Sequence, residues 1–286
     1  MEFDRERAQL WQAMDIGPLW LLRGSEDPLL DAQEAETASV APAAAAPTAP
    51  AKAPAQAAAS SAGASPRVAK PLAEAPAAAV MPPELAKAIA AADWETLKTL
   101  AQKCACCAFA KTRQHVVFGQ GEPGPKLVVV GEAPGSEEDL QGQPFVGKSG
   151  QLLTAMLDAL GIVRGEGAVI LNVLKCRPPQ NRDPHPDEVA CCGHYLRRQL
   201  ELLNPAVIFV SGRYAAQMLL GLQPGASLGR LRGSVHSVEV AGRPVKAVAT
   251  YHPSYLLRSP DAKAKAWEDL CLLRRVMTEA GIAPTG

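Results

Sequence analysis

The stretch Leu127-Val-Val-Val-Gly-Glu-Ala-Pro-Gly135 sets a continuous apolar run directly before a turn that contains one carboxylate. Three further apolar runs follow it, each bounded by Gly, Pro or polar residues, at 169–173, 207–210 and 245–249. Segments with a helical pattern alternate with these runs, at 84–103, 149–160, 186–203, 213–220 and 261–280. Continuous apolar strands that alternate with helices are typical of a parallel sheet covered on both faces. The sequence therefore predicts an α/β fold with three αβα layers and a central, mostly parallel, four-stranded sheet.

In such a sheet a ligand binds beyond the carboxyl ends of the strands. The segments that directly follow the predicted strands are therefore where we expect the functional site. These segments are 131–135, 174–182, 211–214 and 251–258.

Composition divides the chain into three parts. Residues 37–83 are dominated by Ala, Pro and Ser, which cannot bury enough apolar surface to offset the entropy of the chain, so we expect a disordered linker. The folded domain is predicted over 84–286 and an amphipathic N-terminal tail over 1–36. Residues 7–23 resemble the docking peptide of the psi subunit of the bacterial polymerase clamp loader. Two interpretations stay open: a segment that docks to a replication or repair protein, and a weakly ordered tail.

Charge and cysteine usage narrow the class of protein. The formal net charge is zero, but residues 84–286 carry four more basic than acidic side chains, a mild excess that suits DNA phosphates and is shared by many proteins that bind none. The N-terminus has no pattern of a secretory signal, and no stretch of 18 apolar residues is present, so we expect a cytoplasmic protein without a membrane span. Its seven cysteines are then expected to be thiols or metal ligands.

Four cysteines have the spacing of a metal centre. Cys104 and Cys107 form a C-x-x-C pair, and Cys176 and Cys192 supply a second, split pair. Four thiolates suit either zinc or a [4Fe-4S] cluster, and spacing alone does not choose between them. Three cysteines remain and are expected to be neighbours of ligands or core residues: Cys106, Cys191 and Cys271. An exchange of Cys191 for Cys192 as the ligand stays open.

The segment Gly142-Gln-Pro-Phe-Val-Gly-Lys-Ser149 matches the P-loop expression letter for letter. A P-loop follows a buried strand directly, whereas here the acidic sequence Ser-Glu-Glu-Asp-Leu-Gln comes first. We therefore do not expect an NTPase. For Glu137 and Asp139 in that acidic sequence we expect a solvated helix start.

Seven motifs, taken in order over about residues 100–277, resemble the family 4 uracil-DNA glycosylases. The motifs are Cys104-x-x-Cys107, Val117-Phe-Gly-Gln-Gly121, Gly131-Glu-Ala-Pro-Gly135, Gln143-Pro-Phe-Val-Gly147, Asn172-Val-Leu-Lys-Cys-Arg-Pro-Pro179, Asn181-Arg-Asp-Pro184 and His252-Pro-Ser-Tyr-Leu-Leu-Arg258. The resemblance implies a fold of the uracil-DNA glycosylase type and a [4Fe-4S] cluster that ties loops together near the DNA. It implies the cluster ligands Cys104, Cys107, Cys176 and Cys192, the last because Cys-x-x-Tyr-Leu196 fits the family spacing.

Release of uracil requires a flipped base to be gripped while its anion leaves and water attacks C1′. The resemblance assigns a stacking face to Phe145 and a water-ordering or water-deprotonating carboxylate to Glu132, with stabilisation of oxocarbenium-like charge as the second option. The carboxamide of Asn172 can pair with the O4 and N3 edge of uracil. His252 can donate a hydrogen bond to O2 from a neutral imidazole.

Further residues are expected at the rim. Glu138 resembles the family position that excludes the thymine methyl, Asn181 one at the pocket edge, and Ala133 meets the base through its backbone. Phosphate contacts are expected from some of Arg177, Arg182 and Arg258, and a wedge from Leu256 or Leu257.

The sequence thus predicts a monomeric, monofunctional enzyme that hydrolyses the N-glycosidic bond of uracil in DNA and leaves an abasic site, since no lysine nucleophile is evident. Two alternatives differ in class: a non-catalytic iron-sulfur protein that binds DNA or a polymerase, and a zinc-stabilised nucleotide-binding protein. The joint presence of Glu132, Asn172 and His252 favours the enzyme, because a binding module needs none of them.

Overall fold

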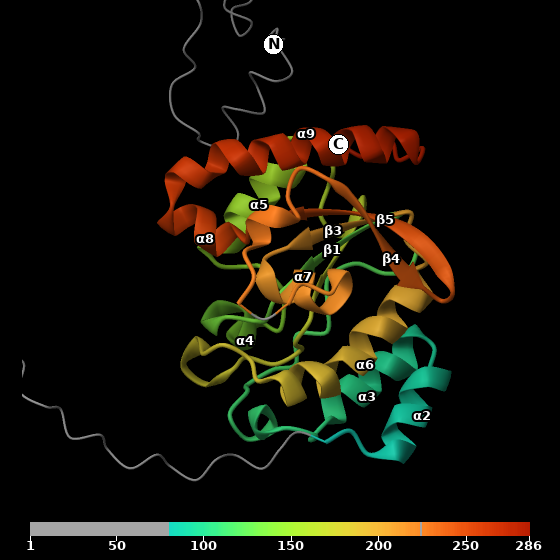
Figure 1. The fold of residues 1–286 in the computed structure, drawn as a ribbon. Coiled ribbons are helices and arrows are strands. Elements are labelled where there is room, and N and C mark those ends of the chain that lie inside the picture. The colour runs from blue at the N-terminus through green and yellow to red at the C-terminus, as the bar shows by residue number, and fades with distance from the viewer. Residues whose placement is uncertain (1–79, 224) are drawn as a thin grey trace, which may run out of the picture.

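The computed structural model describes residues 80–223 and 225–286 (Figure 1). The predicted tail and nearly all of the predicted linker lie outside the described residues.

Helices separate the first four strands along the described chain, and the last two strands are consecutive. The α-helices are α2 (Pro83–Ala91), α3 (Trp94–Lys103), α4 (Ser136–Gln141), α5 (Lys148–Asp158), α6 (Pro186–Leu203), α7 (Arg213–Leu220), α8 (Pro253–Arg258) and α9 (Lys263–Glu279). The strands are β1 (Leu127–Gly131), β2 (Ala168–Asn172), β3 (Val207–Ser211), β4 (Val235–Val240) and β5 (Arg243–Thr250). Short 3₁₀ turns lie at η1 (Ala108–Lys111), η2 (Pro179–Asn181), η3 (Leu228–Arg230) and η4 (Pro260–Ala262).

The five strands form one sheet in the order β2-β1-β3-β5-β4. β1 pairs in parallel with β2 and β3, and β3 pairs in parallel with β5, so the α/β architecture predicted from the sequence is confirmed. The predicted count of four strands is wrong, because β4 adds an antiparallel edge to β5. In β4 only Val238 and Val240 are buried, so this strand has no continuous apolar run.

The sheet is the middle of three layers (Figure 1). Alternate strand residues enter two separate cores, as the two-residue period of a strand requires. In β1, Val128 and Val130 pack toward α2, α3, α6 and α7, whereas Leu127 and Val129 pack toward α5 and α9. Both faces of the sheet are thus covered, which leaves the ends of the parallel strands as the place for a site.

The predicted helix over 84–103 is two helices. Ala92 has an extended backbone, and the Asp93 carboxylate accepts the Thr96 amide at 2.8 Å, which caps a new helix. Helices α6 and α7 begin and end where the sequence predicts, and α5 and α9 differ from the predicted ranges by a few residues. None of the described helices has the length and apolar character to cross a membrane.

Candidate active site and cysteine cavity

A cavity of about 810 Å³ lies beyond the carboxyl ends of the parallel strands. Four of its lining residues lie at the ends of β1, β2, β3 and β5 or within two residues after them: Glu132, Asn172, Arg213 and His252. The cavity is also lined by the other residues that the sequence assigns to the base, which are Ala133, Glu138, Phe145 and Asn181. All seven predicted pocket residues therefore surround one space.

Gly131, the last residue of β1, lets two of these side chains approach each other. A Cβ built on it would lie 2.5 Å from Asn172 Oδ1 and 2.5 Å from Phe145 Cζ. Any larger residue would push one of them away. The amide and the ring consequently meet over a bare backbone, an arrangement that gives a planar base a polar edge and an aromatic face in one place.

Asn172 is buried, with 2% of its surface exposed, and its Oδ1 has no hydrogen-bond partner among the described residues. A buried acceptor without a partner costs on the order of 1–3 kcal/mol. The residue ends β2, where its backbone pairs with Gly131. A ligand with a donor that faces Oδ1 removes this cost.

His252 precedes α8 and presents a neutral imidazole to the cavity. Its Nδ1 accepts the backbone N–H of Ser254 at 3.2 Å and lies 2.8 Å from Ser254 Oγ, an arrangement that suits a ring with its proton on Nε2. Burial, with help from Arg258, lowers the pKa of His252 to about 4. Nε2 is inaccessible and has no partner among the described residues, and the ring stacks on Phe145 at 5.5 Å between centroids. The side chain is therefore a prepared hydrogen-bond donor.

Glu132 is half-buried in the turn after β1. Burial, and next the negative charge of Asp183, raise the pKa of Glu132 to about 7, while Arg213 and Arg258 act in the opposite direction. A carboxyl group with such a pKa exchanges protons near neutral pH, which suits a general base.

Glu138 has a different environment from the one expected. Its carboxylate accepts the backbone amides of Gly135 at 3.0 Å, Val146 at 2.9 Å and Gly147 at 3.0 Å. The side chain thus ties the turn after β1 to the loop that carries Phe145. Whether it also excludes a thymine methyl stays a prediction.

Asp139 is not the solvated residue that the sequence suggested. Only 2% of it is exposed, and its carboxylate accepts the amides of Gln114 at 2.9 Å and His115 at 3.3 Å. The P-loop-like segment around these residues follows helix α4 and not a strand, and it forms the loop between α4 and α5.

The three arginines that were predicted to bind phosphate differ in their surroundings. Arg182 forms a salt bridge with buried Glu188 at 2.6 Å and lies over the ring of Phe109, so it is committed to packing. The Nε of Arg177 donates to Asn181 Oδ1 at 2.8 Å. Arg258 lines the cavity and is exposed.

The two leucines proposed as a wedge also separate. Leu256 is fully buried in the core under α8, so its assignment as a wedge is wrong. Leu257 is 42% exposed, and Tyr255 is 41% exposed. The helical turn of α8 points one leucine into the core and the other outward.

Sequence reasoning missed Arg213 and Asp183, which form a salt bridge at 3.1 Å on the cavity wall, with Arg213 over the ring of Tyr214. It also gave no role to Gly131 beyond opening a motif. The start of α7 directly after β3 was the available signal for Arg213.

A second, small enclosed cavity is lined by five cysteines: Cys104, Cys107, Cys176, Cys191 and Cys192. Cations border the sulfurs, because Arg113 Nη1 donates to Cys176 Sγ at 3.2 Å and buried Lys175 lies beside them. Among the described residues no group of three or more His, Cys, Asp and Glu side chains is arranged to hold a metal ion. A donor set of soft sulfurs around an enclosed space, with positive charge at its edge, fits an iron-sulfur cluster.

The fourth sulfur has two candidates with different surroundings. Cys192 Sγ accepts the backbone N–H of Lys175 at 3.3 Å and lies near Cys176. The thiol of Cys191 instead contacts that of Cys106, which does not line the cavity. Cys271 is partly buried against the core below α9.

Comparison with known proteins connects this geometry to a family. The family model described as "Uracil DNA glycosylase superfamily" matches residues 118–271. A type-4 uracil-DNA glycosylase of Archaeoglobus fulgidus is 47% identical over 168 residues, which cover 58% of this chain and 84% of that protein. Its counterparts in Pyrobaculum aerophilum (40% identical; 63% of this chain, 92% of that protein) and Thermotoga maritima (43%; 58% and 83%) are also similar.

Proposed function

The chain belongs to the uracil-DNA glycosylase superfamily, and from this membership and the cavity we infer that it is a uracil-DNA glycosylase that acts in DNA repair. The single observation that carries the inference is a pair of polar atoms beside the ring of Phe145, Asn172 Oδ1 and His252 Nε2, which have no hydrogen-bond partner in the described part of the chain. An acceptor, a donor and a stacking face match the edge and plane of uracil.

Selectivity for uracil over cytosine follows from whether the ring atom N3 carries a proton. Uracil carries a proton on N3, which can be donated to Asn172 Oδ1, whereas cytosine presents a lone pair there and would face the same oxygen with repulsion. Phe145 stacks on the flipped base. Asn172 therefore favours uracil over cytosine.

The bond-breaking step needs a nucleophile and a stabilised leaving group. Water attacks C1′ as the bond from C1′ to N1 breaks, and the electron pair of that bond leaves with uracil as its anion. The Nε2–H of His252 hydrogen-bonds O2, where part of the negative charge develops. Glu132 orders the water and takes its proton. The products are free uracil and an abasic site in DNA.

A [4Fe-4S] cluster would be held by Cys104, Cys107, Cys176 and Cys192, and it would supply a covalent tie between loops rather than chemistry, because hydrolysis transfers no electrons. Cys104 follows α3, Cys176 follows β2 and Cys192 lies in α6, so the tie would join three separate segments. The hydrogen bond from the Lys175 backbone N–H to Cys192 Sγ supports Cys192, rather than Cys191, as the fourth cluster ligand.

The test uses a labelled oligonucleotide with one uracil, treated with alkali after incubation with brown, cluster-loaded protein. We expect cleavage at uracil and none at cytosine or thymine. His252→Ala should slow release by on the order of 100-fold or more. His236→Ala is the matched control, because His236 lies on the edge strand β4 and contacts Leu231 O. An uncut uracil strand that is nevertheless retained by the protein would favour a non-catalytic DNA-binding protein.

A further inference from the structure

The loop between α4 and α5 carries Phe145 in a strained backbone conformation. Phe145 has φ 53°, in the left-handed region that non-glycine residues seldom adopt. Such a conformation costs on the order of 1 kcal/mol or more and persists where surrounding contacts determine it. Only 5% of the residue is exposed, and its ring stacks on His252. The contacts that hold this backbone therefore also set the angle of the stacking face.

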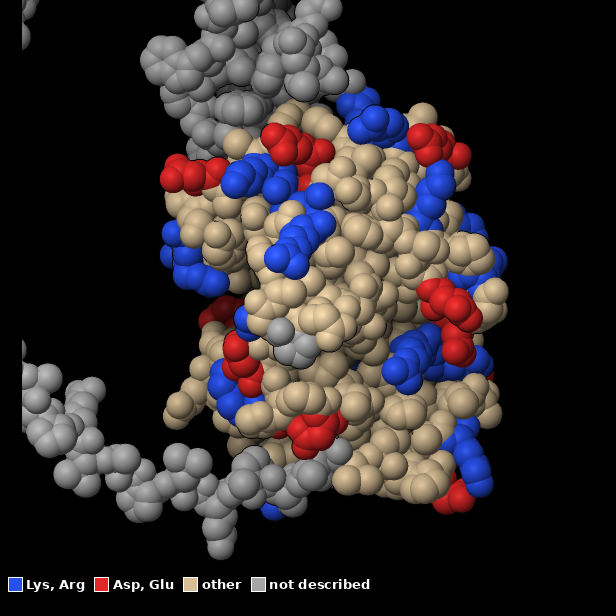
Figure 2. Space-filling view, viewed as in Figure 1, with Lys and Arg blue, Asp and Glu red and all other residues tan. Residues whose placement is uncertain are grey.

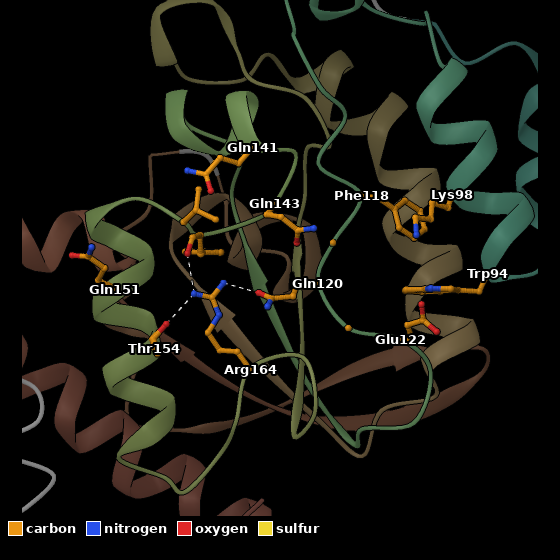
Figure 3. Close-up of a pocket in the computed structure, with 14 residues that line it drawn as sticks. Trp94, Lys98, Phe118, Gln120, Glu122, Gln141, Gln143, Gln151, Thr154 and Arg164 are labelled. Carbon is orange, nitrogen blue, oxygen red and sulfur yellow. Dashed lines mark hydrogen bonds between the residues drawn. The ribbon is translucent and has the colours of Figure 1, made fainter. Parts of the chain in front are cut away.

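Arg164, which precedes β2, binds the two carbonyls at this point. Its Nη1 donates to Phe145 O at 2.9 Å and its Nη2 to Pro144 O at 2.9 Å. The same guanidinium is held by Thr154 Oγ1 at 2.9 Å and Gln120 Oε1 at 2.8 Å. Figure 3 shows these last two bonds and the position of Arg164 between helix α5 and the segment of Gln120.

The other end of the loop is held by negative charge. Glu138 accepts the amides of Val146 and Gly147, directly after Phe145. Gly150 completes the fit, since a Cβ there would overlap the Phe145 carbonyl oxygen. The carbonyls of Pro144 and Phe145 thus meet a cation, and the amides of Val146 and Gly147 meet an anion, which fixes the loop in one orientation.

We propose that Arg164 is a positioning residue for uracil excision, which holds the Pro144 and Phe145 carbonyls so that the Phe145 ring presents its face to the flipped base. The proposal rests on the proposed function. Arginine suits this task because its planar fork reaches several acceptors at fixed angles, whereas lysine offers a point charge.

The first experiment is a double-mutant cycle. Arg164→Met should lower kcat/KM on a uracil oligonucleotide by on the order of 10- to 100-fold, the loss that a small misplacement of a positioning group causes. In a Phe145→Ala background the same change should cost less than about twofold, because there is no ring left to position. If the two losses multiply, Arg164 does not act through Phe145 and the proposal is wrong. Arg198→Met is the matched control, since that arginine holds the Ala92 carbonyl at 2.9 Å far along α6 and should leave excision unchanged.

The second experiment is chemical rescue. Arg164 lines a second cavity of about 810 Å³, which is open to solvent (Figure 3). Phe145 lines both this cavity and the uracil site. Arg164→Ala should therefore regain activity with added methylguanidinium, and not with ethylammonium at the same concentration. The Arg164→Ala, Phe145→Ala double variant should show no rescue. Equal rescue by both cations would contradict the forked contact.

A measurement that does not depend on catalysis tests the role of Arg164 separately from the proposed function. Hydrogen exchange at the Val146 and Gly147 amides should be faster in Arg164→Met than in wild type, at equal cluster absorbance. Unchanged exchange would overturn the proposal, whereas a wild type that releases no uracil would overturn the function. If Arg164 variants fail to fold, Thr154→Val removes one of the acceptors that orient the guanidinium and should show the same changes in weaker form.

Discussion

Excision of uracil should depend on pH through the ionisation of Glu132. Burial and the charge of Asp183 raise the pKa of this carboxyl group to about 7. A general base acts in its ionised form, so kcat/KM should rise as pH increases through the pKa. The pKa of His252, lowered to about 4 by burial, lies below this range, and the imidazole stays neutral throughout.

The size of the effect follows from the ionised fraction. A carboxyl group with a pKa near 7 is roughly one-tenth ionised at pH 6 and nine-tenths ionised at pH 8, so the rate should increase about tenfold. A glutamate with an ordinary pKa near 4.3 would be ionised at both values and give a flat profile. Single-turnover release of uracil from a single-stranded oligonucleotide, at constant ionic strength from pH 5 to 9, measures the difference.

Asp183→Asn moves this profile in a known direction. It removes a negative charge that raises the pKa of Glu132 and frees Arg213 from its salt bridge. Both effects favour the ionised carboxylate, so the midpoint should fall. The side chains of Asp183 and Arg213 are 74% and 45% exposed, and solvent screening limits the shift to roughly half a pH unit. A midpoint that rises in Asp183→Asn, or a flat wild-type profile, would refute the assignment of Glu132.

The same ionisation has a consequence for stability. A carboxyl group with a raised pKa contributes stability below its unfolded pKa, near 4.3, and loses that contribution as pH rises through about 7. Glu132→Gln should therefore abolish most excision and increase the free energy of unfolding at pH 8 by on the order of 2 kcal/mol, with no increase at pH 4. Urea unfolding at the two pH values measures it, and a less stable variant at pH 8 would contradict the buried charge.

Three further outcomes test other parts of the site. Cys192→Ser should lose the brown absorbance and unfold at lower temperature, whereas Cys191→Ser should keep its colour; the reverse result would exchange the two ligands. Asn172→Asp should lower kcat/KM for uracil by at least about tenfold, since a second carboxylate near the base repels the leaving anion, and an unchanged rate would remove Asn172 from recognition. Leu256→Ala should lower the free energy of unfolding by about 2–5 kcal/mol, because this leucine is fully buried. Leu257→Ala should leave the free energy of unfolding unchanged and slow excision from duplex DNA more than from single strands. Equal slowing on both substrates would refute the role of Leu257 as a wedge.

The sequence predicts a strand well where all of its side chains are apolar and buried. The apolar runs of β1, β2 and β3 are buried on both faces, as is the end of β5 at residues 247–250, and so each run differs from its flanks. The edge strand β4 has a half-exposed pattern and escaped notice for that reason. The break at Asp93 was also missed, because a capping carboxylate reads as one more polar residue within a helical pattern.

The candidate site was predictable to the extent that it follows strand ends. Asn172 and His252 stand at such ends, and the motifs around them carry the family resemblance. The hydrogen-bond partners of a side chain depend on distant loops, so sequence did not reveal that Glu138 binds three amides. Charge alone equally could not show that Arg182 binds Glu188.

The surface charge adds a constraint on how DNA is bound. On the face shown in Figure 2, basic and acidic side chains are interspersed over the described domain. A face with interspersed charges gives weak general attraction to phosphates, so DNA bound on this face would depend on a few specific contacts. Near the cavity Arg258 is exposed, whereas Arg182 is paired with buried Glu188. Discrimination then depends on what enters the pocket. Asn172 Oδ1 and His252 Nε2 have no hydrogen-bond partner within residues 80–223 and 225–286, and they are the groups that make entry favourable for uracil.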